Sequence, residues 1–289
     1  MRSTWCVSLM LAVFGWASLG HLASAAAEPE TLIYLKPGNA LRGDYAVKLL
    51  ELALARSGRD YVLKPTDGTM TQTRAARELE LGHIDLIWAG TSADYEQRFR
   101  PVRIPVLRGL DGYRICIIGR DRQAAFSAVT SLDDLRGLSI GQGAGWSDVK
   151  ILEAAGFRVL SAPYESLFAM VERERFDCFL RGVHEAPQEV AEHQAEHPGI
   201  ALESEVLLVY PFTSFFFVNR DDTALAEALE TGLEAAYDDG SFMALFNAHP
   251  AITAIFAEAH MDGRRRFDIP NPLLTEATRN IPDRYWHGR

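Results

Sequence analysis

Basic side chains are scarce in this 289-residue chain. Lysine and arginine together number 29 against 39 aspartates and glutamates, which gives a formal net charge of −10. Nucleic acids require a basic face that neutralises their phosphates, so a nucleic-acid partner is disfavoured, and an anionic membrane surface is disfavoured for the same reason. The few lysines also leave little scope for amine chemistry; they are Lys36, Lys48, Lys64 and Lys150.

The motifs of common catalytic and metal sites are missing as well. The sequence has no His-Glu-x-x-His motif and no cysteine pair at metal-ligand spacing. His193 and His197 stand one helical turn apart, as two metal ligands can, but their highly polar surroundings favour a solvated helix face. We therefore expect no catalytic residue, no metal and no cofactor.

Apolar runs of signal-sequence type occur only at the N-terminus. Cys6–Leu22 follows the positive charge of Arg2, but it is too short and too interrupted by glycine to make a good membrane span. The small residues Ala23–Ala27 provide a cleavage site. Residues 1–27 are thus predicted to be a signal peptide cleaved near Ala25 to Ala27, which places the mature chain in a periplasm. No later segment reaches the roughly 18–20 apolar residues of a membrane helix.

Cysteine is rare in the mature chain, where only Cys116 and Cys178 remain. Export would permit a disulfide between them. Both lie in apolar, strand-like runs, however, and about 260 residues suffice to build a core without a covalent link. We therefore prefer two buried free thiols.

Strand and helix patterns alternate along the mature chain, as in wound α/β proteins with mostly parallel sheets. A break at Gly109–Gly112 separates two such units, which predicts two lobes. The strands are expected at Thr31–Leu35, Tyr61–Leu63, Ile84–Ala89, Tyr113–Ile118, Leu138–Gly141, Val159–Ser161, Asp177–Leu180, Val206–Val209 and Ser214–Asn219. The main helices are expected at Tyr45–Arg56, with Asp44 as its cap, and at Thr71–Leu81, Ser147–Ala155, Ser166–Glu174, Pro187–Glu196 and Thr223–Asp238.

Three segments carry a family resemblance. Leu81–Ser92 joins Gly-His-Ile-Asp to an apolar strand and Gly-Thr-Ser. Ser131–Ser147 joins a capped turn to a strand and a glycine-rich loop, and Arg175–Leu180 is an Asp-led strand. In this order and spacing, the chain from Thr31 to Phe246 resembles the family 3 periplasmic solute-binding proteins, which include the amino-acid receptors of ABC importers. Its details are more similar to an uncharacterised branch than to typical amino-acid receptors.

The resemblance implies a type II periplasmic-binding fold. In this fold two α/β lobes are joined by two crossover strands, and they close like a hinge on a ligand bound between them. It implies that residues 28–110 and 213–289 form lobe 1 and residues 111–212 form lobe 2. It further implies a small-molecule ligand, a membrane permease or sensor as partner, and a monomeric protein. The Arg- and Pro-rich tail from Gly263 is expected to lie along the surface.

In lobe 2, the glycine-rich loop and the end of the next strand are the candidate ligand contacts. Glycines let a backbone approach a ligand, and free N–H groups at a helix start attract anions. Gln142, Gly143 and Trp146 are therefore candidates, although a plain tight turn is the alternative. Arg181 and His184 follow the strand where amino-acid receptors usually carry an aspartate for the ligand's ammonium. A guanidinium suits carboxylate or phosphate, so Arg181 favours an anionic solute, unless it forms a salt bridge to Glu185.

In lobe 1, the candidates are the polar and aromatic residues near strand and helix ends. Thr91, Ser92 and Tyr95 follow the apolar strand, and the family's carboxylate-binding arginine would correspond to Arg98 only if an insertion is allowed. Arg98 on a solvated face is the alternative. Tyr34, Gln72 and Trp88 could also reach the cleft, although core packing or helix capping competes for each.

Three functional hypotheses remain open. The first is a solute-binding protein that closes on a small polar, anionic molecule for import or sensing. The second is a lyase or hydrolase on the same scaffold, using Glu185 or Asp148 with His184 as acid/base groups. The third is an accessory protein of a membrane sensor, with a vestigial cleft.

Overall fold

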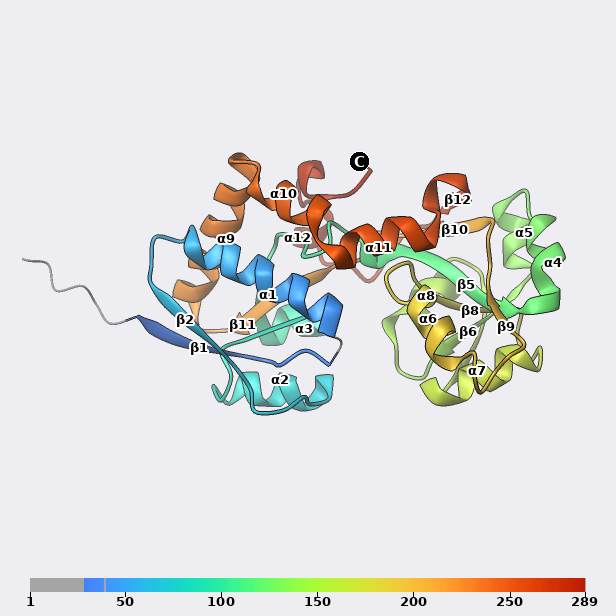
Figure 1. Cartoon of the computed structure of the whole chain (residues 1–289), viewed down its shortest axis with the longest axis horizontal. Helices are drawn as coiled ribbons and strands as arrows, with labels where there is room; N and C mark the ends of the chain where they lie inside the picture. The colour runs from blue at the N-terminus through green and yellow to red at the C-terminus, as the bar shows by residue number, and fades with distance from the viewer. Residues whose placement is uncertain (1–28, 39, 289) are drawn as a thin grey trace, which may run out of the picture.

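A computed structural model describes residues 29–38 and 40–288 as two lobes side by side (Figure 1). The predicted signal peptide, residues 1–27, lies outside the described residues. Each lobe is an α/β unit built on its own sheet, as the alternating pattern predicted. Within the described part of the chain, no helix is long and apolar enough to cross a membrane.

The first lobe contains a five-stranded sheet with the order β2-β1-β3-β11-β4. Strands β1, β2 and β3 are parallel, whereas β11 runs antiparallel to both β3 and β4. Its strands are β1 (Glu30–Tyr34), β2 (Tyr61–Pro65), β3 (Leu86–Gly90), β4 (Phe99–Val102) and β11 (Ser214–Asn219). Its helices are α1 (Ala40–Ala55), α2 (Gln72–Glu80), α3 (Ala93–Arg98), α9 (Thr223–Asp238), α10 (Ser241–Ala248) and α11 (Pro250–Ala259).

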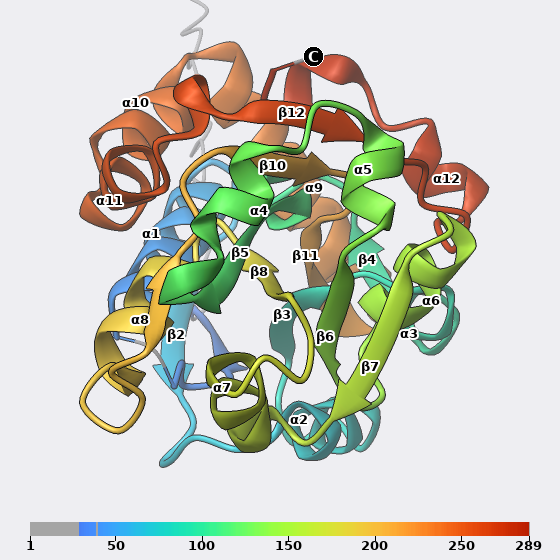
Figure 2. The ribbon, with the colours of Figure 1, turned by 90° about the vertical axis from the view of Figure 1, so that its right-hand side faces the viewer.

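The second lobe contains a seven-stranded sheet with the order β12-β10-β5-β8-β6-β7, and β9 pairs with β5 (Figure 2). Strands β6, β7 and β8 are parallel, and β5 is antiparallel to β8. Its strands are β5 (Tyr113–Gly119), β6 (Ser139–Gly143), β7 (Arg158–Ala162), β8 (Cys178–Gly182), β9 (Ile200–Leu202), β10 (Val206–Val209) and β12 (Arg265–Asp268). Its helices are α4 (Gln123–Ser127), α5 (Leu132–Arg136), α6 (Ser147–Ala154), α7 (Tyr164–Glu172) and α8 (Ala186–His193).

All nine expected strands are present, but the first helix begins earlier than expected. It starts at Ala40, so Asp44 lies inside the helix and is not its cap. The Asp44 carboxylate instead lies 3.1 Å from Nε2 of His249. Close packing of α1 against α9 uses Gly232, because a Cβ at that position would lie 1.8 Å from the carbonyl oxygen of Ala53.

The C-terminal tail belongs to both lobes, which corrects the assignment of residues 213–289 to lobe 1 alone. Strand β12 pairs in parallel with β10 at the edge of the second sheet. A buried ion pair fixes it there, with Nη1 of Arg264 3.1 Å from Oε2 of Glu203. The chain then returns to lobe 1, where Thr275 and Thr278 of the α12 region (Glu276–Arg279) donate hydrogen bonds to the Glu96 carboxylate. The tail therefore bridges the lobes in addition to the two expected crossovers.

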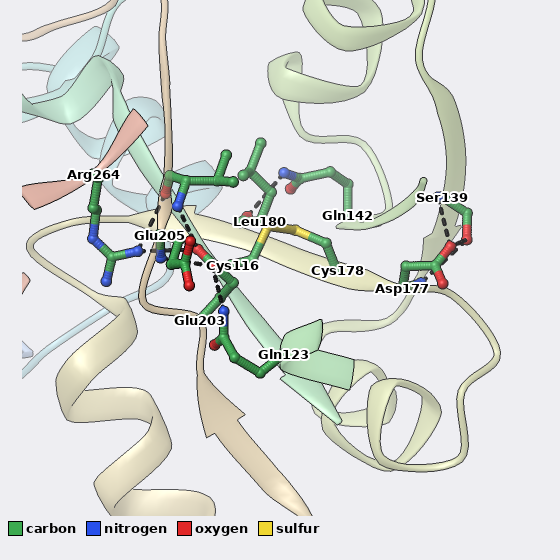
Figure 3. The surroundings of a disulfide bond; sticks show 11 residues. Cys116, Gln123, Ser139, Gln142, Asp177, Cys178, Leu180, Glu203, Glu205 and Arg264 are labelled. Carbon is green, nitrogen blue, oxygen red and sulfur yellow. Dashed lines mark hydrogen bonds and ion pairs between the residues drawn. A yellow bond between two sulfur atoms is a disulfide. The ribbon is translucent and has the colours of Figure 1, made fainter. Parts of the chain in front are cut away.

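The two cysteines form a disulfide, so the expectation of free thiols is wrong. Cys116 on β5 and Cys178 on β8 are bonded, with Cα atoms 5.2 Å apart (Figure 3). The two strands are antiparallel neighbours, and Cys116 pairs directly with Leu180. This register brings Cys116 and Cys178 to the same face, within disulfide reach. Both cysteines are buried in the core of the second lobe.

Candidate ligand-binding cleft

The ends of several strands from both sheets meet at a polar cavity of about 560 Å³. Strand β3 ends there at Gly90, β8 ends at Gly182, and the loop after β6 leads into α6 at Trp146. A volume of this size fits a small organic molecule. The cavity is lined by Gln72, Thr73, Gly90, Thr91, Ser92, Tyr95, Asp111, Arg114, Gly145, Trp146, Ser147, Asp148, Arg181, His184, Glu185, Phe212 and Ser214.

The wall from lobe 1 is polar but uncharged. Ser92 caps α3, and its hydroxyl accepts a hydrogen bond from the backbone N–H of Tyr95 at 3.2 Å. The hydroxyl of Thr91 donates to Glu96 at 2.8 Å, and the same carboxylate accepts the two hydroxyl groups of the tail. The tail thus helps to hold Thr91, which is a cavity residue. Burial raises the pKa of Tyr95, so its hydroxyl stays protonated.

The wall from lobe 2 is a chain of alternating charges. Nη2 of Arg114 lies 2.9 Å from Oδ1 of Asp148, and Nη1 lies 3.7 Å from Oε2 of Glu185. Tyr210 donates its hydroxyl to the same Asp148 carboxylate. Burial opposes the charge on Arg114, but the nearby carboxylates, led by Asp148, raise its pKa. Arg114 is only 5% exposed, and its pairing with carboxylates offsets the free-energy cost of removing its charge from water.

Arg181 continues this charge chain. Its guanidinium donates to both oxygens of Glu189, at 2.7 and 2.6 Å, and Nη2 also lies 3.0 Å from Oε1 of Glu185. The ring of Trp146 lies over the guanidinium, 4.6 Å from its carbon. Burial opposes the charge, but Glu185 and Glu189 raise the pKa of Arg181. The salt-bridge interpretation of Arg181 therefore holds, while its side chain still lines the cavity.

The floor of the cavity lies at the two crossovers. Tyr210 N–H donates to the carbonyl of Gly112 at 3.1 Å, and a Cβ at Gly112 would lie 1.9 Å from the Tyr210 carbonyl oxygen, so only glycine allows this approach. The Asp111 carboxylate accepts from the hydroxyl of Ser214 at 2.7 Å and from its backbone N–H at 3.2 Å. Asp111 and Ser214 thereby tie one crossover to the other.

Eight predicted candidates lie at this cavity or at its apolar neighbour, and four do not. The seven in the polar cavity are Gln72, Thr91, Ser92, Tyr95, Trp146, Arg181 and His184, while Trp88 lies in the adjoining cavity described below.

The four other candidates line neither cavity and contact other parts of the protein instead. Arg98 pairs with Glu80 and Asp94 at the surface, which corrects its placement in the cleft. Gln142 is fully buried and donates to the carbonyl of Leu180 (Figure 3). Gly143 packs under Trp146, since a Cβ there would lie 2.2 Å from that ring. Tyr34 packs beside the first core.

Sequence reasoning missed Asp111 and Arg114 as cavity residues. Arg114 is the one charged residue in the strand Tyr113–Gly119, and a lone arginine in a buried apolar strand indicates a buried ion pair. Asp148 was considered only as an acid/base group, and Glu185 as an acid/base group or as the salt-bridge partner of Arg181. Both hold arginines, and Oε1 of Glu185 lies 4.0 Å from Nε2 of His184. Among the described residues, no group of three or more His, Cys, Asp or Glu side chains could hold a metal ion.

Comparison with solved structures decides the fold. The probable amino-acid ABC transporter extracellular-binding protein YtmK of Bacillus subtilis superposes with a TM-score of 0.56 at 14% identity, covering 78% of this chain and 99% of that one. The chain has the two-lobed type II periplasmic-binding fold. A protein of glutathione import via GshT and the cystine ABC importer TcyBC in Streptococcus mutans gives a TM-score of 0.52 at 12% identity, covering 76% and 95% of the two chains.

A histidine kinase sensor domain with similarity to periplasmic binding proteins also shares this fold, with a TM-score of 0.52 at 13% identity over 77% of this chain and 96% of that one. No protein-family model and no curated protein sequence matches the chain. The fold shared with these solved structures is the one that the three sequence segments implied.

Proposed function

We propose that this chain is an exported solute-binding protein whose two lobes close on a small polar solute in the cleft. The observation that carries the proposal is the polar cavity of about 560 Å³ to which both sheets and both crossovers contribute. Solved structures of the same fold include a transporter-binding protein and a kinase sensor domain, so the solute would be passed to a permease or reported to a sensor in the membrane. The proposal involves no covalent chemistry, and the N-terminal signal supports a periplasmic location.

The charges around the cavity favour a solute that is neutral or carries an ammonium group. Arg114 and Arg181 are the two guanidinium groups, and both are already paired with carboxylates. Four buried or half-buried carboxylates surround them, from Asp111, Asp148, Glu185 and Glu189. An anionic solute would have to displace these carboxylates and would add to the negative excess. We therefore replace the anionic solute expected from Arg181 alone with an amine or a neutral molecule.

Native mass spectrometry of the freshly purified protein, followed by a thermal-shift screen, tests the proposal. The screen compares amines, amino acids, sugars and organic acids. A specific ligand at a concentration of 100 times its Kd stabilises the folded protein by about 2.7 kcal/mol, which raises the melting temperature by roughly 5–11 °C. We expect amines or amino acids to give such shifts.

A pair of matched variants locates the binding site. Glu185→Gln removes a cavity carboxylate and should weaken binding of an amine hit by about tenfold or more. Glu192→Gln makes the same change on α8 outside the cavity and should leave binding unchanged. The proposal fails if no solute shifts the melting temperature, and the charge argument fails if only organic acids do.

A further inference from the structure

A second, mostly apolar cavity of about 290 Å³ adjoins the polar one. Asp111, His184 and Ser214 line both cavities, so the two spaces meet at the crossovers. The walls of this second cavity, hereafter the apolar cavity, come from the start of α1, strand β3, the segment before β5 and helix α11. Its apolar lining includes Leu35, Tyr45, Met70, Trp88, Val106 and Ile252.

The aromatic residues Tyr45 and Trp88 contribute ring surface to the walls of the apolar cavity. The Tyr45 hydroxyl donates to the carbonyl of Val106 at 2.9 Å, so its ring face is what the cavity meets. Trp88 is only partly buried although it lies on a central strand of the first sheet. Covering the apolar surface of a cavity with an apolar group of a ligand removes that surface from water and stabilises the complex.

A carboxylate stands where the two cavities meet. Asp111 is 4% exposed, and its carboxylate accepts hydrogen bonds from the hydroxyl and the backbone N–H of Ser214. Among the side chains that the structure describes, those of residues 29–38 and 43–288, no basic group forms an ion pair with Asp111. A buried carboxylate without a cationic partner costs free energy, which a bound cation would recover.

From this juxtaposition we infer that the solute is an amphiphilic amine. Its ammonium group binds at Asp111, its apolar part, an alkyl chain or an aromatic ring, fills the apolar cavity, and its polar remainder faces the charged wall of lobe 2. The inference rests on the proposed function and adds to it the chemical class of the solute. Neither cavity alone would select such a molecule. The polar cavity offers less apolar surface, and the apolar cavity has one buried carboxylate, Asp111, besides the exposed Lys36 at its wall.

Isothermal titration calorimetry with a homologous series tests the inference directly. The probes are ethylamine, butylamine and hexylamine, with hexanol and hexanoate as chain-matched compounds that lack the positive charge. Each added methylene that is buried should strengthen binding about fourfold, with an increasingly negative heat-capacity change. Hexylamine should bind at least about tenfold more tightly than hexanol, because only the amine pairs with the buried carboxylate.

Three variants separate the two parts of the site. Met70→Gln makes a partly exposed wall residue of the apolar cavity polar and should flatten the dependence on chain length. Leu81→Gln makes the same kind of change at a residue that is 49% exposed and lines neither cavity, and it should leave the series unchanged. Asp111→Asn keeps the shape and the contact with Ser214 and should abolish the preference for hexylamine over hexanol.

The outcomes distinguish the inference from the proposed function. The inference is supported if amine affinity rises with chain length, if Met70→Gln removes that rise, and if Asp111→Asn removes the preference for hexylamine over hexanol. Binding of small polar solutes with no effect of chain length, or with hexanoate preferred over hexylamine, overturns the inference and leaves a solute-binding protein. If neither this series nor the wider thermal-shift screen yields a ligand, the proposed function itself fails.

Discussion

Removing the disulfide should destabilise the second lobe strongly. The bond joins residues 62 apart in sequence, and cross-linking a loop of this length lowers the entropy of the unfolded chain by an amount worth about 4 kcal/mol at 25 °C. The Cys116→Ala/Cys178→Ala variant is therefore expected to lose about 4 kcal/mol of unfolding free energy. This corresponds to a fall of roughly 8–16 °C in the melting temperature of the whole mature chain, which has about 260 residues.

Guanidinium denaturation followed by far-UV circular dichroism measures this loss. The comparison uses the oxidised protein, the protein with dithiothreitol, and the double variant with and without dithiothreitol. Reductant should lower the midpoint of the wild-type protein once the bond is reduced, and it should have no effect on the variant. Equal midpoints for the oxidised protein and the double variant would refute the loop-entropy argument, and two titratable thiols in the denatured, unreduced protein would refute the bond itself.

Three further predictions concern buried charges and caps. Arg181→Met leaves the buried Glu189 carboxylate without its cation and should cost about 3–5 kcal/mol of unfolding free energy in denaturant titrations; a loss below 1 kcal/mol would contradict the buried pairing. Thr278→Val removes one donor from the buried Glu96 carboxylate and should cost about 1–3 kcal/mol, whereas an unchanged midpoint would mean that the tail contact contributes nothing. Hydrogen bonds from Thr130 and its neighbour lower the pKa of Asp134 to about 2, so its stabilising effect is present above the ordinary aspartate pKa and is lost as the pH falls through about 2; a carbon-detected NMR titration with a midpoint near 4 would contradict this.

The sequence was most informative where one pattern decided the structure locally. Apolar runs such as Ile84–Ala89 and Ser214–Asn219 form interior strands of the sheet, because a continuous apolar strand is stable where both faces of the sheet are covered by other elements. Three strands were missed, the short β9 and two strands at sheet edges, β4 and β12. β4 contains Pro101 and β12 contains Arg265 and Arg266, and edge strands tolerate proline and charge because one side of their backbone needs no partner.

The site was harder to predict, because its electrostatics depend on contacts across the fold. The position of Arg181 at the end of a strand identified it as a cavity residue. Whether its guanidinium is free to bind a solute depends on Glu189, one turn into the next helix, which already pairs with it. Arg114 lies at the start of β5 in lobe 2, and Asp111 precedes it in the crossover, where it contacts Ser214 of the first sheet. The disulfide was misjudged because pairing depends on the register of β5 against β8, which spacing along the chain does not reveal.

The central claim is that two hinged lobes close on a bound solute. Small-angle X-ray scattering of the purified protein, with and without a saturating amount of the solute identified by native mass spectrometry, measures this directly. The account predicts a smaller radius of gyration in the complex, because the lobes approach each other around the cleft. Saturating solute with an unchanged radius of gyration would contradict it.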